Sequence, residues 1–286
     1  MNQIKIFIEL TRLTKPIGFM LLFWPCSWGL ALGYNFQNNL NNFFYFLILF
    51  FLGSVFMRSA GCIINDIVDK DLDKKVQRTK NRPIAANKIS INQALAYAFI
   101  LCIAAFVILI QFNTFTIFLG IASMFLAFSY PYMKRITYWP QLFLGLTFNW
   151  GIIMAWASLN NAFSIDIILL YLAAIFWTLG YDTIYGAQDI VDDEIIGVKS
   201  TSIKFKKNIK IFTSLCYSIS SALIIYIFLP RMNINIGTFL IIFFILTLIY
   251  QLVIFDKNNS LSCLKAFKNN NLSGLIMFFS IIFLKI

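Results

Sequence analysis

The chain has 286 residues, of which 60% are hydrophobic and only 12% carry a charge. A soluble domain of this length would have about a quarter charged residues, so the composition excludes most soluble folds. A soluble all-helical protein is the alternative, but it would need many more polar helix faces. We therefore predict an all-α, polytopic membrane protein.

The chain contains five cysteines and no histidine. The cysteines are far apart in the sequence and mostly lie in apolar runs, which favours packing roles over a disulfide framework or a zinc site. The lack of histidine excludes His metal sites and Ser-His or Cys-His nucleophile pairs. Any catalysis must depend on carboxylates, Lys, Arg, Tyr, Asn and metal.

Apolar runs of nearly membrane-spanning length recur along the chain and predict a bundle of nine transmembrane helices. They cover residues 17–34, 43–62, 92–111, 114–132, 139–158, 164–186, 209–229, 236–255 and 272–286. The start of the chain lacks the features of a signal or transit peptide. We find no linker between these runs, so we predict that residues 1–286 form a single membrane domain.

The basic residues predict the orientation of this bundle. Of the 23 Lys and Arg residues, all but Arg231 and Lys285 fall on the N-terminus and on the links after the second, fourth, sixth and eighth spans, with Arg58 counted among them. By the positive-inside rule these segments, including the N-terminus, are cytoplasmic. The net charge of +11 then indicates topology and contact with anionic lipid, and not nucleic-acid binding.

Two acidic stretches, residues 65–73 and 189–194, lie on these cytoplasmic links and hold eight of the 12 acidic residues, four in each. A carboxylate at a membrane boundary is costly unless its charge is used. Residues four apart share one face of a helix, and this spacing aligns Asn65, Asp69 and Asp73 in one stretch and Asp189 and Asp193 in the other. Mg²⁺ prefers such oxygen ligands and completes its coordination with water and phosphate.

Further charged residues accompany the two stretches. Asp182 lies two helical turns before Asp189, on nearly the same face, and is expected deeper in the membrane. Two facing rows of carboxylates would repel each other, whereas a diphosphate bridged by Mg²⁺ would neutralise them. Arg or Lys would then bind the remaining phosphate oxygens, and we assign this role to Arg78, Arg82 and Lys199. The alternative is that the acids are solvated residues that balance nearby lysines.

These motifs resemble a known family. Residues 58–73, with Asn81-Arg82-Pro83 behind them, closely resemble the first signature of UbiA-type intramembrane prenyltransferases, NDxxDxxxD. Residues 181–201 resemble their second signature, of the DxxxD type. Residues 15–18 with Trp24-Pro25, and residues 130–135 followed by Pro140-Gln141, are similar to family members that act on 4-hydroxybenzoate in ubiquinone synthesis.

The resemblance implies transfer of a polyprenyl chain from its diphosphate to the ring carbon next to the hydroxyl of 4-hydroxybenzoate. It implies Mg²⁺ as the cofactor, held by Asn65, Asp69, Asp73, Asp189 and Asp193. The ring proton would pass to Asp189 or Asp182, and Arg135 is the expected partner of the benzoate carboxylate. We expect contact with membrane lipid and no obligate protein partner.

Three alternatives stay open from the sequence alone. A related prenyltransferase could act on dihydroxynaphthoate, homogentisate or haem. A cation transporter would place acids near the bilayer midplane, whereas here they gather near one face. A non-catalytic scaffold that binds lipid or diphosphate is the third. For the location we favour a bacterial inner membrane, with a mitochondrial inner membrane as the alternative.

Overall fold

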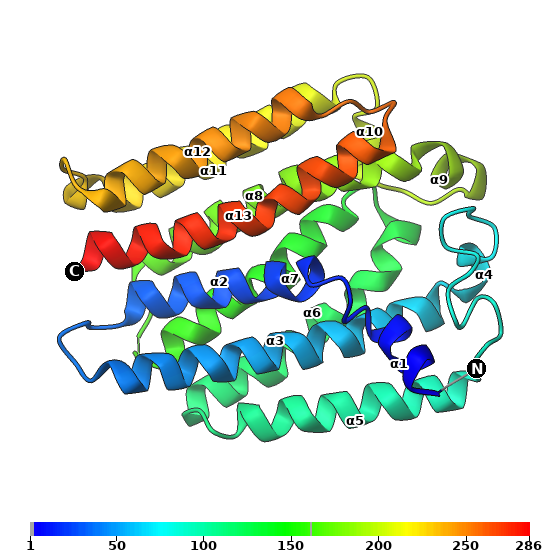
Figure 1. The fold of residues 1–286 in the computed structure, drawn as a ribbon, viewed down its shortest axis with the longest axis horizontal. Helices are drawn as coiled ribbons and strands as arrows, with labels where there is room; N and C mark the ends of the chain where they lie inside the picture. Colours follow the sequence, from blue (N-terminus) through cyan, green and yellow to red (C-terminus); the bar gives the residue numbers. More distant parts are fainter. Residues whose placement is uncertain (1–2, 161) are drawn as a thin grey trace.

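The computed structural model describes residues 3–160 and 162–286, and within them every regular element is a helix (Figure 1). The helices are α1 (Gln3–Thr11), α2 (Ile17–Gly33), α3 (Leu40–Val68), α4 (Lys70–Asp73), α5 (Ile91–Leu109), α6 (Thr114–Ile136), α7 (Pro140–Ala157), α8 (Ile165–Gly186), η1 (Ala187–Asp189), α9 (Ile190–Ile196), α10 (Thr201–Lys204), α11 (Ile209–Phe228), η2 (Leu229–Arg231), α12 (Ile236–Ile254) and α13 (Ser260–Lys285). The all-α prediction is therefore confirmed.

Each predicted span lies on one long helix, and most predicted ends are correct to within a few residues. The last helix differs most, because α13 begins at Ser260 and not near residue 272. Its first turns contain Lys265, Lys268 and a run of asparagines, which lower the hydropathy that marks a span. Arg58 is a second correction, because it lies inside α3 and not on a link.

The length and hydropathy of these helices identify a membrane protein. Seven of the described helical segments are long and apolar enough to cross a bilayer. They are α3, α5, α6, α8 continued through α9, α11 continued through η2, α12 and α13. The helix α2 is apolar but has 17 residues, and α7 is not among the seven. The total of nine spans and the cytoplasmic N-terminus stay predictions, although the two ends of the chain lie at opposite ends of the bundle (Figure 1).

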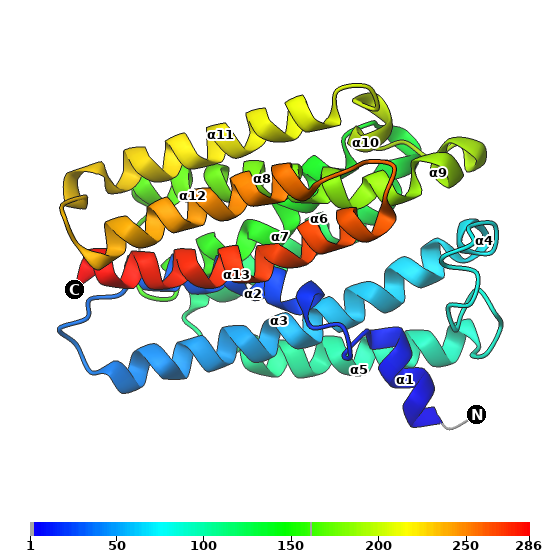
Figure 2. The ribbon, with the colours of Figure 1, turned by 45° about the horizontal axis from the view of Figure 1, so that its top comes forward.

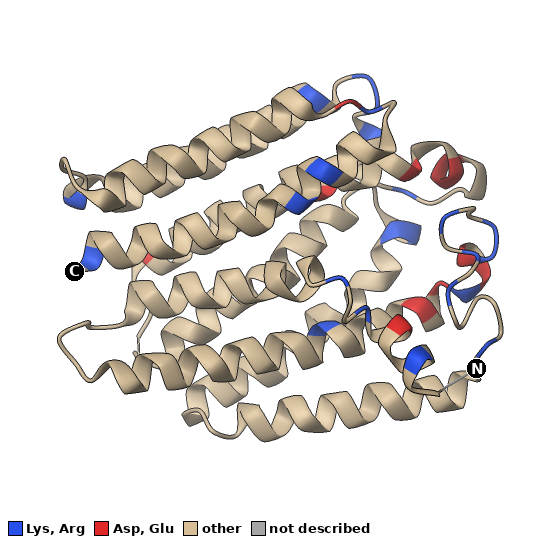
Figure 3. Ribbon diagram, viewed as in Figure 1, with Lys and Arg blue, Asp and Glu red and all other residues tan. Residues whose placement is uncertain are grey.

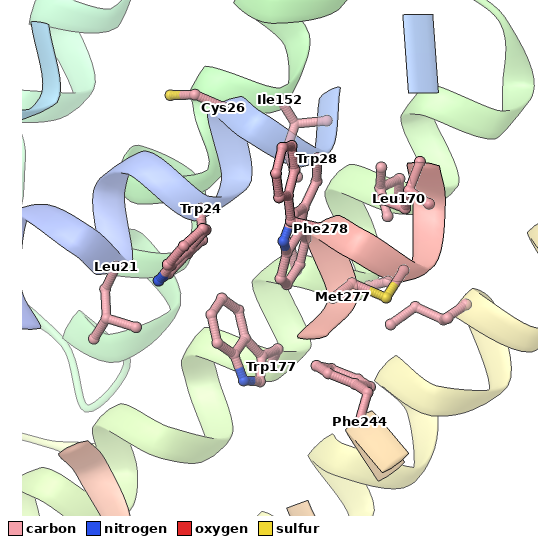
Figure 4. Close-up of a cluster of buried hydrophobic side chains, with 14 of the residues drawn as sticks. Leu21, Trp24, Cys26, Trp28, Ile152, Leu170, Trp177, Phe244, Met277 and Phe278 are labelled. Atoms are coloured by element: carbon pink, nitrogen blue, oxygen red, sulfur yellow. The ribbon is translucent and has the colours of Figure 1, made fainter. Parts of the chain in front are cut away.

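The core lies where α2, α7, α8 and α13 meet. Trp28 and Trp177 are fully buried there with ring centroids 4.9 Å apart, and Leu170 and Phe244 lie around them (Figure 4). Both indole nitrogens donate hydrogen bonds to α13, to Gly274 O and to Asn270 Oδ1. Buried polar groups in lipid need such partners, and these bonds therefore fix α13 against the core.

Glycine allows α2 and α7 to approach closely. A Cβ atom at Gly29 would lie 2.3 Å from the carbonyl oxygen of Ile152, and one at Gly151 would lie 2.3 Å from Cys26 Sγ. Small residues at helix interfaces permit this contact between backbones in a membrane. All five cysteines are free, as expected from their spacing.

Charged side chains gather at one end of the bundle. Figure 3 shows most Lys, Arg, Asp and Glu residues at the end that holds α4 and α9, and Arg231 and Lys285 lie at the other end. The two views of the ribbon agree that α4 and α9 occupy the same end (Figures 1 and 2). The two acidic stretches, far apart in the sequence, therefore lie on the same side of the bundle.

Candidate active site

A cavity of about 200 Å³ lies between the two acidic stretches. It is lined by every predicted site residue except Arg135, namely Asn65, Asp69, Asp73, Arg78, Arg82, Asp182, Asp189, Asp193 and Lys199. The bundle thus brings together residues that are more than a hundred positions apart in the sequence. Their roles as metal ligands, phosphate-binding residues and general base stay predictions.

The first stretch keeps helical spacing across a break. The helix α3 ends at Val68 and α4 begins at Lys70, but the amides of Asp69 and Asp73 donate to the carbonyls of Asn65 and Asp69, at 2.9 and 2.8 Å. These bonds are the i to i−4 bonds of an α-helix, so the spacing of four residues still brings the three side chains to one face. All three side chains line the cavity.

The second stretch follows the end of α8. A 3₁₀ turn at Ala187–Asp189 leads into α9, which ends at Ile196 and is followed by Gly197 with a φ of +75°. Glycine adopts this left-handed conformation without the steric cost of a Cβ atom. The chain then turns back, and the amide of Lys199 donates to Lys134 O at 2.8 Å. This turn places Lys199 in the lining of the small cavity, where its Nζ donates to Ile136 O at 3.1 Å.

An ion pair joins the two stretches directly. Arg78 donates two hydrogen bonds to Asp189, from Nε to Oδ1 at 2.8 Å and from Nη2 to Oδ2 at 2.6 Å. Such fork-shaped pairs are stronger and more directional than single contacts. Burial lowers the pKa of Arg78, but the hydrogen bond to Asp189 and the nearby charges of Tyr185, Asp189 and Asp193 together raise the pKa above its ordinary value. The guanidinium therefore keeps its charge at the centre of the site.

Lys134, at the end of α6, pairs with Asp69 and was not predicted as a site residue. Asp69 is 1% exposed, and its second oxygen, Oδ1, is buried without a hydrogen-bond partner among the described residues. Burial raises the pKa of Asp69, and the charge of Lys134 opposes this shift. The contact between α3 and α6 that creates this pair is tertiary. The sequence signal for it is the basic pair at the end of the 130–135 motif, of which the family resemblance singles out only Arg135.

Arg135 lies outside the cavity lining. Its Nη2 donates to Val68 O at 2.7 Å and lies 3.8 Å from Asp69 Oδ1. The guanidinium thus closes the end of α3, where carbonyl groups lack helical partners. As placed, it holds the backbone beside Asp69 and does not point into the cavity.

Asp73 and Asp66 share one arginine. Arg82 Nη1 donates to Asp73 Oδ2 at 2.8 Å and to Asp66 Oδ1 at 3.1 Å. Asp66 also accepts from Arg12 Nη2 at 2.5 Å. Asp66 is not among the residues that the four-residue spacing aligns, and the structure buries it between the two guanidinium groups.

The donor set suits a hydrated magnesium ion that shares its ligands with phosphate. Within the described residues, no three Asp, Glu, Cys or His side chains stand close enough to hold a metal by themselves. The acidic groups instead pair with Arg78, Arg82 and Lys134. Mg²⁺ takes few ligands from protein and the rest from water and phosphate, and Asp69 Oδ1 offers a buried oxygen with no other donor. The residues therefore fit such an ion.

A second, larger cavity of about 1350 Å³ adjoins the first. Both are lined by Asn65, Arg78, Arg82, Tyr130, Pro131 and Asp182. The rest of its wall is mainly apolar and comes chiefly from α2, α3, α5, α6 and α7, with further residues from α1, α8 and α13. The volume exceeds that of a typical drug-sized pocket, about 300–1,000 Å³. The site thus joins a charged chamber to a long apolar one.

Arg58 is a further basic residue that the sequence did not mark as functional. It lines the large cavity with Tyr130, Tyr181 and Asp182. Its Nη1 contacts Cys62 Sγ at 2.9 Å, while its Nε is buried and finds no hydrogen-bond partner in the part of the chain that the structure describes. A guanidinium with unused donors inside an apolar cavity favours a bound anion. Only the fold reveals this, because from the sequence Arg58 is counted among the basic residues of the cytoplasmic links, whereas it lies inside α3.

Comparison with known proteins decides the family. The family model described as "UbiA prenyltransferase family" matches residues 22–282. The chain belongs to the UbiA prenyltransferase family. The resemblance that the two acidic signatures suggested is therefore confirmed.

Similar proteins with curated descriptions carry one kind of name. The mitochondrial 4-hydroxybenzoate polyprenyltransferase of Caenorhabditis elegans is 38% identical, over 98% of this chain and 78% of the relative. The 4-hydroxybenzoate octaprenyltransferase of Pseudoalteromonas translucida is 40% identical, over 99% and 95%. The mitochondrial enzyme of Arabidopsis thaliana is 44% identical over 74% of this chain, which spans about half of that relative's length, 52%.

Solved structures of UbiA homologs share the fold. One from Aeropyrum pernix K1 has a TM-score of 0.76 at 24% identity and covers 92% of this chain and 96% of its own. One from Archaeoglobus fulgidus, bound to GPP and Mg²⁺, has a TM-score of 0.72 at 19% identity and covers 97% and 99%. At these identities the likeness shows the arrangement of the helices.

Proposed function

We propose that this protein transfers a polyprenyl chain from polyprenyl diphosphate to 4-hydroxybenzoate, at the carbon next to the hydroxyl, in ubiquinone synthesis. The observation that carries the proposal is the meeting of both acidic stretches at one small cavity that adjoins a large apolar one. The names of the relatives in Caenorhabditis elegans and Pseudoalteromonas translucida supply the acceptor. The charged cavity suits a diphosphate head, and the adjoining apolar cavity suits a long isoprenoid tail.

The charged residues of this chain would exchange partners when the substrate binds. Asn65, Asp69, Asp73, Asp189 and Asp193 would hold Mg²⁺. Once bound, Mg²⁺ would stabilise the negative charge that grows on the leaving diphosphate. These acids would release their basic partners Arg78, Arg82 and Lys134, which would then bind phosphate oxygens. Lys199 lines the same cavity and would add a further positive charge.

The walls near the junction of the cavities would protect the reaction. Cleavage of the C–O bond leaves an allylic cation, which water would capture if it entered. Tyr130, Tyr181 and Tyr185 line the large cavity near Asp182, and aromatic faces stabilise a nearby cation. The apolar wall beyond them would hold the isoprenoid tail and exclude water.

Asp182 is the better candidate for the base that takes the ring proton. It lines both cavities, whereas Asp189 lines only the smaller one and is held by Arg78. A base must lie within hydrogen-bond reach of the proton that it removes. An acceptor ring in the large cavity would meet Asp182 first.

Two arginines compete for the carboxylate of the acceptor. Arg58 has an unpaired Nε and lines the large cavity, while Arg135 is bound to the end of α3. We therefore favour Arg58 for this role. Arg135 would support Asp69 and Val68 from outside the cavity.

The location follows from the same relatives. Close bacterial relatives are described as octaprenyltransferases and eukaryotic ones as mitochondrial. We propose a bacterial inner membrane for this chain, with the mitochondrial inner membrane as the alternative, and a cytoplasmic or matrix-facing site at the basic end.

An acceptor panel tests the proposal. Purified protein with Mg²⁺ and polyprenyl diphosphate is offered 4-hydroxybenzoate, dihydroxynaphthoate, homogentisate and haem, and we expect product only from the first. EDTA should abolish the reaction, as should Asp69→Ala or Asp189→Ala. Asp71→Ala is the matched control, because Asp71 lies in the same link with its side chain 89% exposed. Turnover that survives EDTA, or a preference for another acceptor, would contradict the proposal.

A further inference from the structure

Arg12 is a basic residue on the chain between α1 and α2, outside the two acidic stretches. Its Nη2 donates to Asp66 Oδ1 at 2.5 Å and its Nη1 lies 3.5 Å from Cys62 Sγ. Asp66 is 2% exposed and follows Asn65, one of the proposed magnesium ligands. The contact therefore reaches from the N-terminal segment to the first acidic stretch.

We infer that Arg12 is a positioning residue that neutralises the buried carboxylate of Asp66, so that Arg82 is free to leave Asp66 and bind the diphosphate of the substrate. The inference rests on the proposed function for the identity of that ligand. It assigns no contact between Arg12 and the substrate.

The geometry shows why one arginine is not enough. Arg12 and Arg82 both donate to the same oxygen of Asp66, and Arg82 uses the same nitrogen to reach Asp73. Arg82 therefore has two carboxylates to satisfy and lines both cavities, where the substrate would lie. A buried carboxylate that loses its only cation is strongly destabilised. Without Arg12, movement of Arg82 toward a phosphate would leave Asp66 in that state.

The helix α1 holds Arg12 in this place. Ile6 and Leu10 are buried in a cluster with Ala60 and Ile63 of α3, and the ring of Phe7 meets Tyr97 of α5 at 5.2 Å. The backbone of Arg12 adopts a φ of 55°, a conformation that L residues other than Asn and Asp rarely adopt. The docked helix and this turn together aim the guanidinium at α3.

The arrangement predicts a particular pattern of loss and rescue. Arg12→Ala should weaken the binding of Mg²⁺-pyrophosphate, because Arg82 becomes the only counter-charge of Asp66. Asp66→Asn in the same chain should restore it, because no charge remains to be neutralised. Asp66→Asn alone should bind about as well as the wild type. A role in which Arg12 only packs the fold would show no such rescue, since the change at Asp66 replaces none of the lost contacts.

The test measures the dissociation constant of inorganic pyrophosphate with Mg²⁺ by calorimetry on the full chain in detergent. We expect about a tenfold loss for Arg12→Ala and recovery to within about threefold of the wild type in the double variant, the range of coupling seen for contacting residues. Lys5→Ala is the control, because it removes a positive charge from an exposed position on α1 that makes no ion pair with any residue of 3–160 or 162–286. Thermal unfolding of each variant without ligand reports whether it folds.

Two results would overturn the inference: binding by Arg12→Ala within twofold of the wild type, or a double variant as weak as Arg12→Ala. If Arg12→Ala does not fold, Phe7→Ala is used in its place, because it loosens α1. Its pyrophosphate binding is measured with and without Asp66→Asn, and a lack of rescue by Asp66→Asn again counts against the inference. Pyrophosphate binding is measured without an acceptor. Its result therefore tests the role of Arg12 separately from the proposed prenyl transfer. A wild type that binds pyrophosphate and shows the rescue, yet prenylates no acceptor, contradicts the proposed reaction alone.

Discussion

The pair Arg78–Asp189 should be strong in the free protein and should weaken when substrate binds. The two side chains make a double hydrogen bond with Arg78 42% and Asp189 15% exposed. Hydrogen bonds to charged groups contribute about 1.5–3 kcal/mol when buried. Solvent screens the exposed arginine, so we expect a coupling free energy of about 1–2 kcal/mol between the two side chains.

A double-mutant cycle of Arg78→Ala and Asp189→Ala measures this coupling from the free energy of unfolding in mixed micelles. If the two side chains exchange partners for phosphate and Mg²⁺, saturating Mg²⁺-pyrophosphate should reduce the coupling to about 0.5 kcal/mol or less, the value of a screened surface pair. The control cycle is Lys206–Glu194, an exposed pair 2.7 Å apart between α9 and the segment after α10, and its coupling should not respond. A coupling that stays unchanged or grows with the ligand would refute the exchange of partners.

Three further predictions follow from the cavities and the core. Arg58→Ala should raise the KM for 4-hydroxybenzoate by about tenfold or more, as expected for a lost charged hydrogen bond. Arg135→Ala should raise this KM much less, and equal effects of the two variants in steady-state assays would contradict our choice of Arg58. Asp182→Asn should lower kcat by about 10²–10⁴-fold, the usual contribution of a general base. Calorimetry should show unchanged pyrophosphate binding by this variant, and a normal kcat would exclude Asp182 as the general base. Gly29→Ala should destabilise the fold by about 1–3 kcal/mol in unfolding assays, because its Cβ would overlap the backbone of α7, and a neutral result would contradict the close contact of α2 and α7.

The sequence predicted the helices and the acidic faces because both depend on local periodicity. Apolar runs located the long helices, and the spacing of four residues located Asn65, Asp69 and Asp73 on one face. It failed at α13, where lysines and asparagines within the first turns lowered the hydropathy although the helix continues. Hydropathy detects contact with lipid, and the polar part of α13 satisfies its side chains inside the protein, for example through Asn270 and Gln251.

The partners of the acidic residues could not be read from the sequence. Lys134 reaches Asp69 because α6 ends beside α3, and Arg12 reaches Asp66 because α1 docks on the same helix. Arg58 looked like part of a basic link, but it lies within α3 and faces the large cavity. Each of these contacts depends on how helices pack, which a single sequence with many basic residues near its links does not determine.

The central claim is that both acidic stretches bind one metal–diphosphate complex, and Mn²⁺ as a substitute for Mg²⁺ tests it most directly. Electron paramagnetic resonance counts the Mn²⁺ ions that the protein binds in the presence of pyrophosphate. We predict that Asp69→Ala and Asp189→Ala each lower the amount bound, while Asp71→Ala leaves it unchanged. Unaltered Mn²⁺ binding after the loss of either Asp69 or Asp189 would contradict the account.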